Sequence, residues 1–131
     1  MTKERDLRES HDKLVRDGLP SMLAQRGVRF GVRRARPDEI DELLARKLHE
    51  EVDELSAAGP AESHLEELAD VYEVLLAIAA RRGMTPEMLE TVRANKARRR
   101  GTFAGGTVLE WTEDPGEVEP ERGDGRPAAE R

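Results

Sequence analysis

The feature that most constrains the fold is a pair of long helical segments separated by a glycine-proline break. Apolar residues recur at helical spacing throughout Pro37–Ala58, and again throughout Ala61–Arg82 as far as Gly83. Because Gly59 and Pro60 interrupt the helical pattern, they end the first segment. The connection between the two segments is short, so the two predicted helices should lie antiparallel as a hairpin.

The remainder of the chain also favours an all-α protein. Only 3% of the 131 residues are aromatic, whereas the helix-forming residues leucine, alanine, glutamate and arginine are abundant. A short helix is predicted over Leu19–Arg26, and a further helix from Pro86 to about Arg99 with Thr85 as its N-cap. We expect Thr107–Trp111 to form a short strand or an extended arm.

Composition and charge exclude several classes of protein. There are no cysteines, which rules out disulfides and thiolate-metal sites. The longest apolar run, Val74–Ala80, is far shorter than the roughly 20 residues that span a bilayer, so we expect no membrane association. The net charge of −6 and the scarcity of aromatic residues argue against nucleic-acid binding. The charged N-terminal residues do not resemble a signal peptide, and a cytoplasmic protein is expected.

Four acidic residues are spaced so that the predicted hairpin brings them together. Glu51 and Glu54 are three residues apart on the first long helix, and their spacing is repeated by Glu67 and Asp70 on the second. Side chains at this spacing share a helix face and lie about 4.5 Å apart along the axis. Because each pair is about equally distant from the turn, Glu54 should lie opposite Glu67. The same reasoning sets Glu51 opposite Asp70.

Two of these acids lie within apolar helix faces. At about 100° per residue, Glu51 falls about 20° from Ile40, inside the apolar sector of its helix. Glu67 falls between Val74 and Val71 on the second helix. Like charges held among apolar side chains destabilise a fold unless a cation binds them. Ligand sets made only of oxygen select hard cations, so the predicted ion is Mg²⁺, with Mn²⁺ as a substitute. The alternative is an acidic helix face that is simply solvated.

Two groups of basic residues are candidates for binding phosphate. Lys13 and Arg16 precede the short helix, and Lys96 and Arg100 lie at the end of the last helix. Arginine favours bidentate contact with phosphate, while lysine acts as a point charge. For the second group, cations that offset the dipole at a helix C-terminus are the alternative interpretation.

Taken together, these segments resemble the all-α nucleoside triphosphate pyrophosphohydrolases, the MazG-like superfamily. The signature of that superfamily is EExxE followed by ExxD, which residues 50–54 and 67–70 match. A phosphoribosyl-ATP-pyrophosphohydrolase-like, or house-cleaning, subgroup begins with a KLVRDxIP-type motif, which residues 13–20 match. Its EELADVxEV and KxxxRGxF-type segments are matched by residues 66–74 and 96–103.

The resemblance covers about residues 11–111 and carries specific expectations. It implies an antiparallel helical bundle and cleavage of a nucleoside triphosphate, or a related nucleotide, to the monophosphate and pyrophosphate. Members of the family form dimers or tetramers, so a homodimer or homotetramer is expected. The implied Mg²⁺ ligands are Glu51, Glu54, Glu67 and Asp70. The expected phosphate contacts are Lys13, Arg16, Lys96 and Arg100. Either Glu51 or Glu54 is the candidate catalytic group that accepts a proton from the attacking water.

The sequence predicts one helical domain over residues 1–111 and a disordered, acidic tail rich in proline and glycine over residues 112–131. Three alternatives to the enzyme remain at this stage. One is a nucleotide-binding module that kept the fold without turnover. Another is a structural protein that oligomerises through Leu65–Ile78. The last is a nucleic-acid binder that uses the basic segment at residues 95–101.

Overall fold

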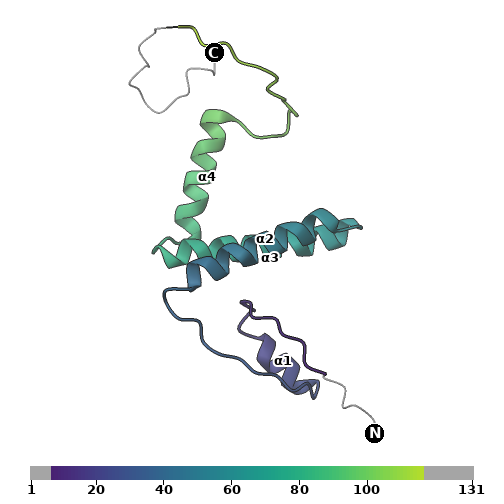
Figure 1. Ribbon diagram of the computed structural model, residues 1–131. Helices are drawn as coiled ribbons and strands as arrows, with labels where there is room; N and C mark the ends of the chain where they lie inside the picture. The colour runs from purple at the N-terminus through teal and green to yellow at the C-terminus, as the bar shows by residue number, and fades with distance from the viewer. Residues whose placement is uncertain (1–6, 117–131) are drawn as a thin grey trace. The chain divides into compact units, whose positions relative to one another are not determined.

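The computed structural model describes residues 7–116 and is all-helical over that range. Figure 1 shows its four helices. They are α1 (Leu19–Gln25), α2 (Ile40–Ala57), α3 (Ala61–Arg81) and α4 (Pro86–Arg100). No strand occurs between residues 7 and 116, so the predicted all-α class is confirmed.

Helices α2 and α3 form the antiparallel hairpin that the sequence predicts, and they pack side by side (Figure 1). The connection consists of Ala58, Gly59 and Pro60, with Pro60 in an extended conformation at the start of α3. Within the described residues, the buried apolar side chains are Leu44 on α2 and Val74 and Ala79 on α3, and each is still 7–8% exposed. Two helices alone can enclose only one narrow seam of side chains, so this core is thin.

Helix α3 carries more apolar residues than α2 covers. Leu65 is 70% exposed and Leu68 is 52% exposed, although both belong to the predicted apolar face. Tyr72 and Leu75 are exposed as well, and the spacing of all four residues places them along one side of the helix. The hairpin therefore presents an apolar strip along α3 that the described part of the chain does not bury.

The helix ends follow local signals in the sequence. Gly83 adopts a left-handed conformation (φ 72°) after α3, and the next amide donates to the carbonyl oxygen of Ala79, a typical glycine-based helix stop. The Thr85 hydroxyl accepts a hydrogen bond from the amide of Met88 at 3.1 Å, which confirms the predicted N-cap of α4.

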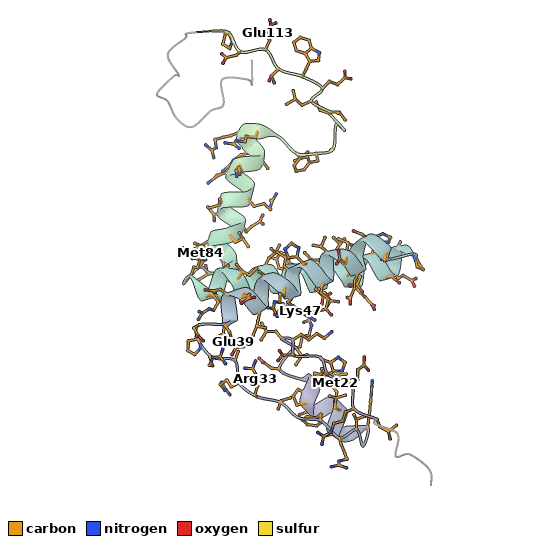
Figure 2. The ribbon with its side chains drawn as sticks, viewed as in Figure 1. Met22, Arg33, Glu39, Lys47, Met84 and Glu113 are labelled. Atoms are coloured by element: carbon orange, nitrogen blue, oxygen red, sulfur yellow. The ribbon has the colours of Figure 1, made fainter. Side chains whose placement is uncertain are left out.

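The start of α2 differs from the sequence prediction by three residues. Residues 37–39 form a turn, and α2 begins only at Ile40. Arg33 makes a bidentate ion pair with Glu39, at 2.8 and 2.9 Å, and the amide of Arg36 donates to the same carboxylate at 2.9 Å (Figure 2). These bonds hold Glu39 as a turn residue, and they lower the pKa of its carboxyl group to about 2, with the Arg33 hydrogen bond as the largest cause.

The described chain divides into two compact units, one ending at Met84 and the other beginning at Thr85. The first unit holds α1 and the α2–α3 hairpin, and the second holds α4 and the segment that follows it. Thr107–Trp111 forms no strand and is exposed throughout. Most of the predicted disordered tail, residues 117–131, lies outside the described residues, as do residues 1–6.

Candidate metal centre and phosphate contacts

Three of the four predicted metal ligands come together between α2 and α3. Glu51 and Glu54 from α2 and Glu67 from α3 each offer a carboxylate oxygen, and these oxygens all lie within 4.8 Å of one another. The proximity of Glu54 to Glu67 is the arrangement that the hairpin geometry predicts. One divalent cation could be reached by all three carboxylates.

Burial distinguishes this group from an ordinary acidic helix face. Glu51 is only 6% exposed and is the buried charged residue of the described chain. Its Oε2 atom and the Oε2 atom of Glu67 are both buried and have no hydrogen-bond partner within the described structure. Buried carboxylate oxygens without partners are costly, because they lose hydration and gain nothing in return. A hard cation would satisfy these oxygens, so the residues present fit such an ion.

The protein itself supplies little positive charge at the group. The Lys47 ammonium lies 3.1 Å from Glu51 and 3.6 Å from Glu50, one turn earlier on the same helix. The pKa of Glu54 is nevertheless raised to about 6. The largest cause is its hydrogen bond with Glu51, followed by desolvation and the negative charges of Glu51, Glu67 and Glu50. Lys47 therefore compensates the negative charge around Glu54 only in part.

Asp70, the fourth predicted ligand, is held elsewhere. Its Oδ1 atom accepts a hydrogen bond of 2.6 Å from Arg16, and Asp70 is not among the three residues whose oxygens converge. The Asp70 side chain is 36% exposed, and that of Arg16 is 60% exposed. The ion pair thus lies at the surface beside the acidic group.

Lys13 makes a second ion pair from the N-terminal segment to the hairpin. Its ammonium lies 2.6 Å from Glu50 on α2. The hydrogen bond to Glu50 raises the pKa of Lys13, and the charges of Glu50, Glu54 and Glu51 act in the same direction. The same bond lowers the pKa of Glu50. Both cations predicted before α1 therefore lie against the acidic side of the hairpin.

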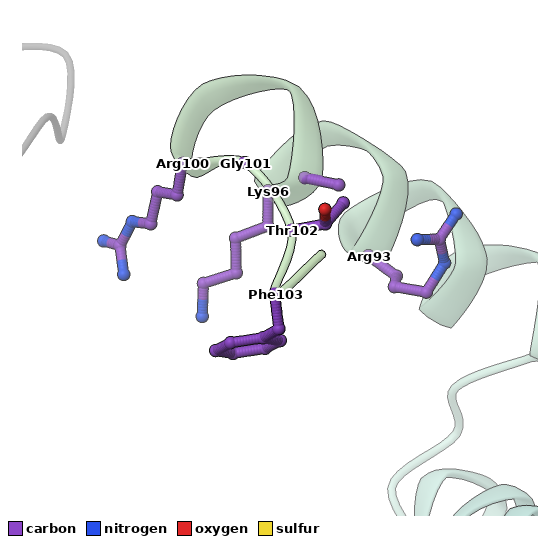
Figure 3. Close-up of a pocket in the computed structure, with 7 residues that line it drawn as sticks. Arg93, Lys96, Arg100, Gly101, Thr102 and Phe103 are labelled. Carbon is purple, nitrogen blue, oxygen red and sulfur yellow. The ribbon is translucent and has the colours of Figure 1, made fainter. Parts of the chain in front are cut away.

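The other two predicted phosphate contacts line an open pocket at the end of α4. The pocket has a volume of about 570 Å³. Figure 3 shows Lys96 and the Phe103 ring pointing to one side of the loop, with Arg93 and Arg100 flanking them. Thr102 contributes a hydroxyl group. Arg93 is already held by a bidentate ion pair with Glu90, at 2.6 and 2.8 Å. The pocket cations that can contact an anion are therefore Lys96 and Arg100, beside the exposed Phe103 ring.

Sequence reasoning missed three residues of these sites. Lys47 is four residues before Glu51, the spacing at which oppositely charged side chains pair on a helix. Arg93 lies three residues before Lys96 on α4, so helical spacing alone could have placed both on one face. Phe103 belongs to the matched KxxxRGxF-type segment, but nothing in the sequence showed that its ring is fully exposed.

Comparisons with protein-family models, with curated proteins and with solved structures give no match for this chain. Among the described helices, none is long and apolar enough to cross a membrane.

Proposed function

We propose that the protein is a nucleotide pyrophosphohydrolase that uses a divalent cation, Mg²⁺ or Mn²⁺, at Glu51, Glu54 and Glu67. The observation that carries this proposal is the convergence of the three carboxylates, with two buried oxygens that have no partner. An all-oxygen set of this kind favours Mg²⁺ and Mn²⁺ over softer metals. Such sites commonly complete their coordination with the phosphates of a substrate.

Each residue has a defined part in the proposed reaction. When bound, a divalent cation supplies Lewis-acid neutralisation of the phosphate charge. In the protein without a cation the pKa of Glu54 is raised to about 6, and Glu54 is proposed to accept a proton from an attacking water. Glu51 is the alternative proton acceptor. The proposed products are a nucleoside monophosphate and pyrophosphate.

Basic residues are proposed to bind the phosphates. Lys13 and Arg16 lie beside the acidic group and are largely exposed, so they can exchange their carboxylate partners for phosphate oxygens. Lys96 and Arg100 are supported as phosphate contacts by the open pocket that they both line at the end of α4. The Phe103 ring in that pocket offers a surface on which a nucleobase can stack.

The exposed strip on α3 supports assembly with a second copy of the chain. Leu65, which is 70% exposed, would contribute about 1–2 kcal/mol if it became fully buried, and the less exposed Leu68, Tyr72 and Leu75 would add to this. We propose that this strip is covered in a homodimer or homotetramer. Sedimentation equilibrium should show an oligomer that a Leu68→Glu substitution dissociates while leaving the helical circular dichroism intact. A wild-type monomer would contradict this part of the proposal.

The proposed activity is tested by a product assay. The protein is incubated with a panel of ribonucleoside and deoxyribonucleoside triphosphates, with and without Mg²⁺, and pyrophosphate is measured separately from orthophosphate. Glu51→Gln should abolish pyrophosphate release. Glu73→Gln, which removes the same charge from an exposed position on α3, should retain it. Nucleotide binding without pyrophosphate release would instead identify a non-catalytic nucleotide-binding module.

A further inference from the structure

The N-terminal segment before α1 contacts both long helices of the hairpin through ion pairs. Lys13 reaches Glu50 on α2, and Arg16 reaches Asp70 on α3, each at 2.6 Å. Asp12 precedes them with a left-handed backbone (φ 47°) and lies 3.5 Å from Arg33. Two exposed ion pairs therefore connect the segment to the hairpin, and a third connects it to the loop before α2.

Arg16 pairs with the one predicted metal ligand that the converging group does not contain. Asp70 follows Glu67 by three residues, so both side chains project from the same side of α3. Yet the converging group contains Glu67 and not Asp70, whose Oδ1 atom is bonded to Arg16. Because both partners are substantially exposed, water screens the pair, and a competing partner can open it.

We infer that Arg16 controls the availability of Asp70 as a fourth metal ligand. This inference rests on the proposed function. Without phosphate, Arg16 holds Asp70, and the cation contacts only Glu51, Glu54 and Glu67. A phosphate group accepts bidentate hydrogen bonds from arginine as a carboxylate does, so it can replace Asp70 as the partner of Arg16. Asp70 is then free to join the other three carboxylates, and binding of metal and of phosphate strengthen each other reciprocally.

Arg16 is in this scheme a positioning residue for Asp70 as well as a phosphate contact. Removal of its charge would strengthen cation binding to some degree whatever Asp70 does, because any nearby positive charge repels a metal ion. Control through Asp70 differs from simple charge repulsion in one respect. The gain in Mn²⁺ affinity on removing Arg16 should depend on the presence of Asp70. Lys13→Gln is the matched control, since it removes the same charge from the same segment but frees Glu50, which is not a member of the converging group.

The test is a titration of the full-length protein with Mn²⁺ alone, followed by electron paramagnetic resonance of the free ion. Asp70→Asn should change the Mn²⁺ affinity less than twofold, because Asp70 is not yet a ligand. Arg16→Gln should tighten Mn²⁺ binding about fivefold, as expected when a surface pair of about 1 kcal/mol no longer competes. Adding Asp70→Asn to Arg16→Gln should remove most of that gain. The smaller gain expected from Lys13→Gln should persist when Asp70→Asn is added.

A second arm uses inorganic phosphate as the probe. Saturating phosphate should tighten Mn²⁺ binding to the wild-type protein, and Asp70→Asn should abolish this effect. The inference is overturned if Asp70→Asn weakens Mn²⁺ binding tenfold without phosphate, or if the gain from Arg16→Gln survives in the double variant. Absence of Mn²⁺ binding in every variant, the wild type included, would refute the metal centre and with it the proposed function.

Discussion

Replacing Glu51 with glutamine should make the metal-free protein more stable and the metal-bound protein less stable. The oxygens of Glu51, Glu54 and Glu67 lie within 4.8 Å of one another. Two full charges at that distance repel by about 3.5 kcal/mol at an effective dielectric constant of ~20. The exposure of Glu54 and the Lys47 ammonium 3.1 Å from Glu51 reduce this figure, so we expect a net gain of about 1 kcal/mol from the substitution.

Bound metal should make the wild-type protein more stable than Glu51→Gln, the reverse of the order expected without metal. A cation at one hundred times its dissociation constant stabilises the wild-type fold by about 2.7 kcal/mol, which corresponds to a rise in Tm of roughly 8 °C for a chain of this size. Without metal, the Tm of Glu51→Gln should exceed that of the wild type by about 3 °C. With metal, that variant should gain little.

The assay is thermal unfolding followed by circular dichroism at 222 nm, in chelator and then in Mg²⁺ or Mn²⁺. Glu73→Gln is the control for loss of a negative charge from an exposed site, and it should show the same metal-dependent rise as the wild type. If Glu51→Gln is destabilised in chelator and its Tm rises with metal as much as that of the wild type, then repulsion at a metal centre is the wrong explanation.

Three further predictions concern pH and local structure. Because the pKa of Glu54 is about 6, protons should compete with the cation for this carboxylate below that pH. The Mn²⁺ affinity, measured by calorimetry, should therefore fall between pH 7 and pH 5. An affinity that does not change over this range would count against a role for Glu54. The carboxyl group of Glu39 has a pKa lowered to about 2, so it contributes stability that is complete above its unfolded pKa near 4.5 and is lost as the pH falls towards 2. Glu39→Gln should therefore lower the Tm at pH 7 and lose most of that effect near pH 2, and an equal effect at both pH values would contradict this role. Thr85→Ala should cost about 1 kcal/mol of helix stability and speed amide exchange at Met88, and unchanged exchange there would show that the cap contributes nothing.

The helix bounds were largely predictable because their signals are local. Glycine and a capping hydroxyl decide where α3 ends and α4 begins, and both act within a few residues of the boundary. The start of α2 was not predictable in this way. Pro37 looks like a first-turn proline, but the pairing of Glu39 with Arg33, six residues earlier, stabilises a turn instead.

The acidic group shows the same division between local and distant effects. Helical spacing and a short connection were enough to predict that Glu54 and Glu67 lie close together. The burial of Glu51 followed from its position among apolar residues of α2. The partner of Asp70 could not be predicted, because Arg16 lies 54 residues away and its pairing depends on how the N-terminal segment folds back onto α3.

Sequence periodicity also could not predict that the apolar strip on α3 is exposed. Periodicity identifies which residues are apolar, but it does not tell which neighbour covers them. Leu65 and Val74 both belong to the apolar pattern of α3, yet the hairpin buries Val74 and leaves Leu65 70% exposed. Leu65 and Val74 are nine residues apart and so lie on opposite sides of α3, and the hairpin turns the Val74 side towards α2.

The account is tested most directly by locating the cation. Crystals grown or soaked with Mn²⁺ would reveal the ion by its anomalous scattering. We predict one strong peak between Glu51, Glu54 and Glu67, about 2 Å from an oxygen of each carboxylate, which is absent in Glu51→Gln. Unmoved carboxylates with no peak between them, or a peak bound only at another site, would contradict the proposed metal centre.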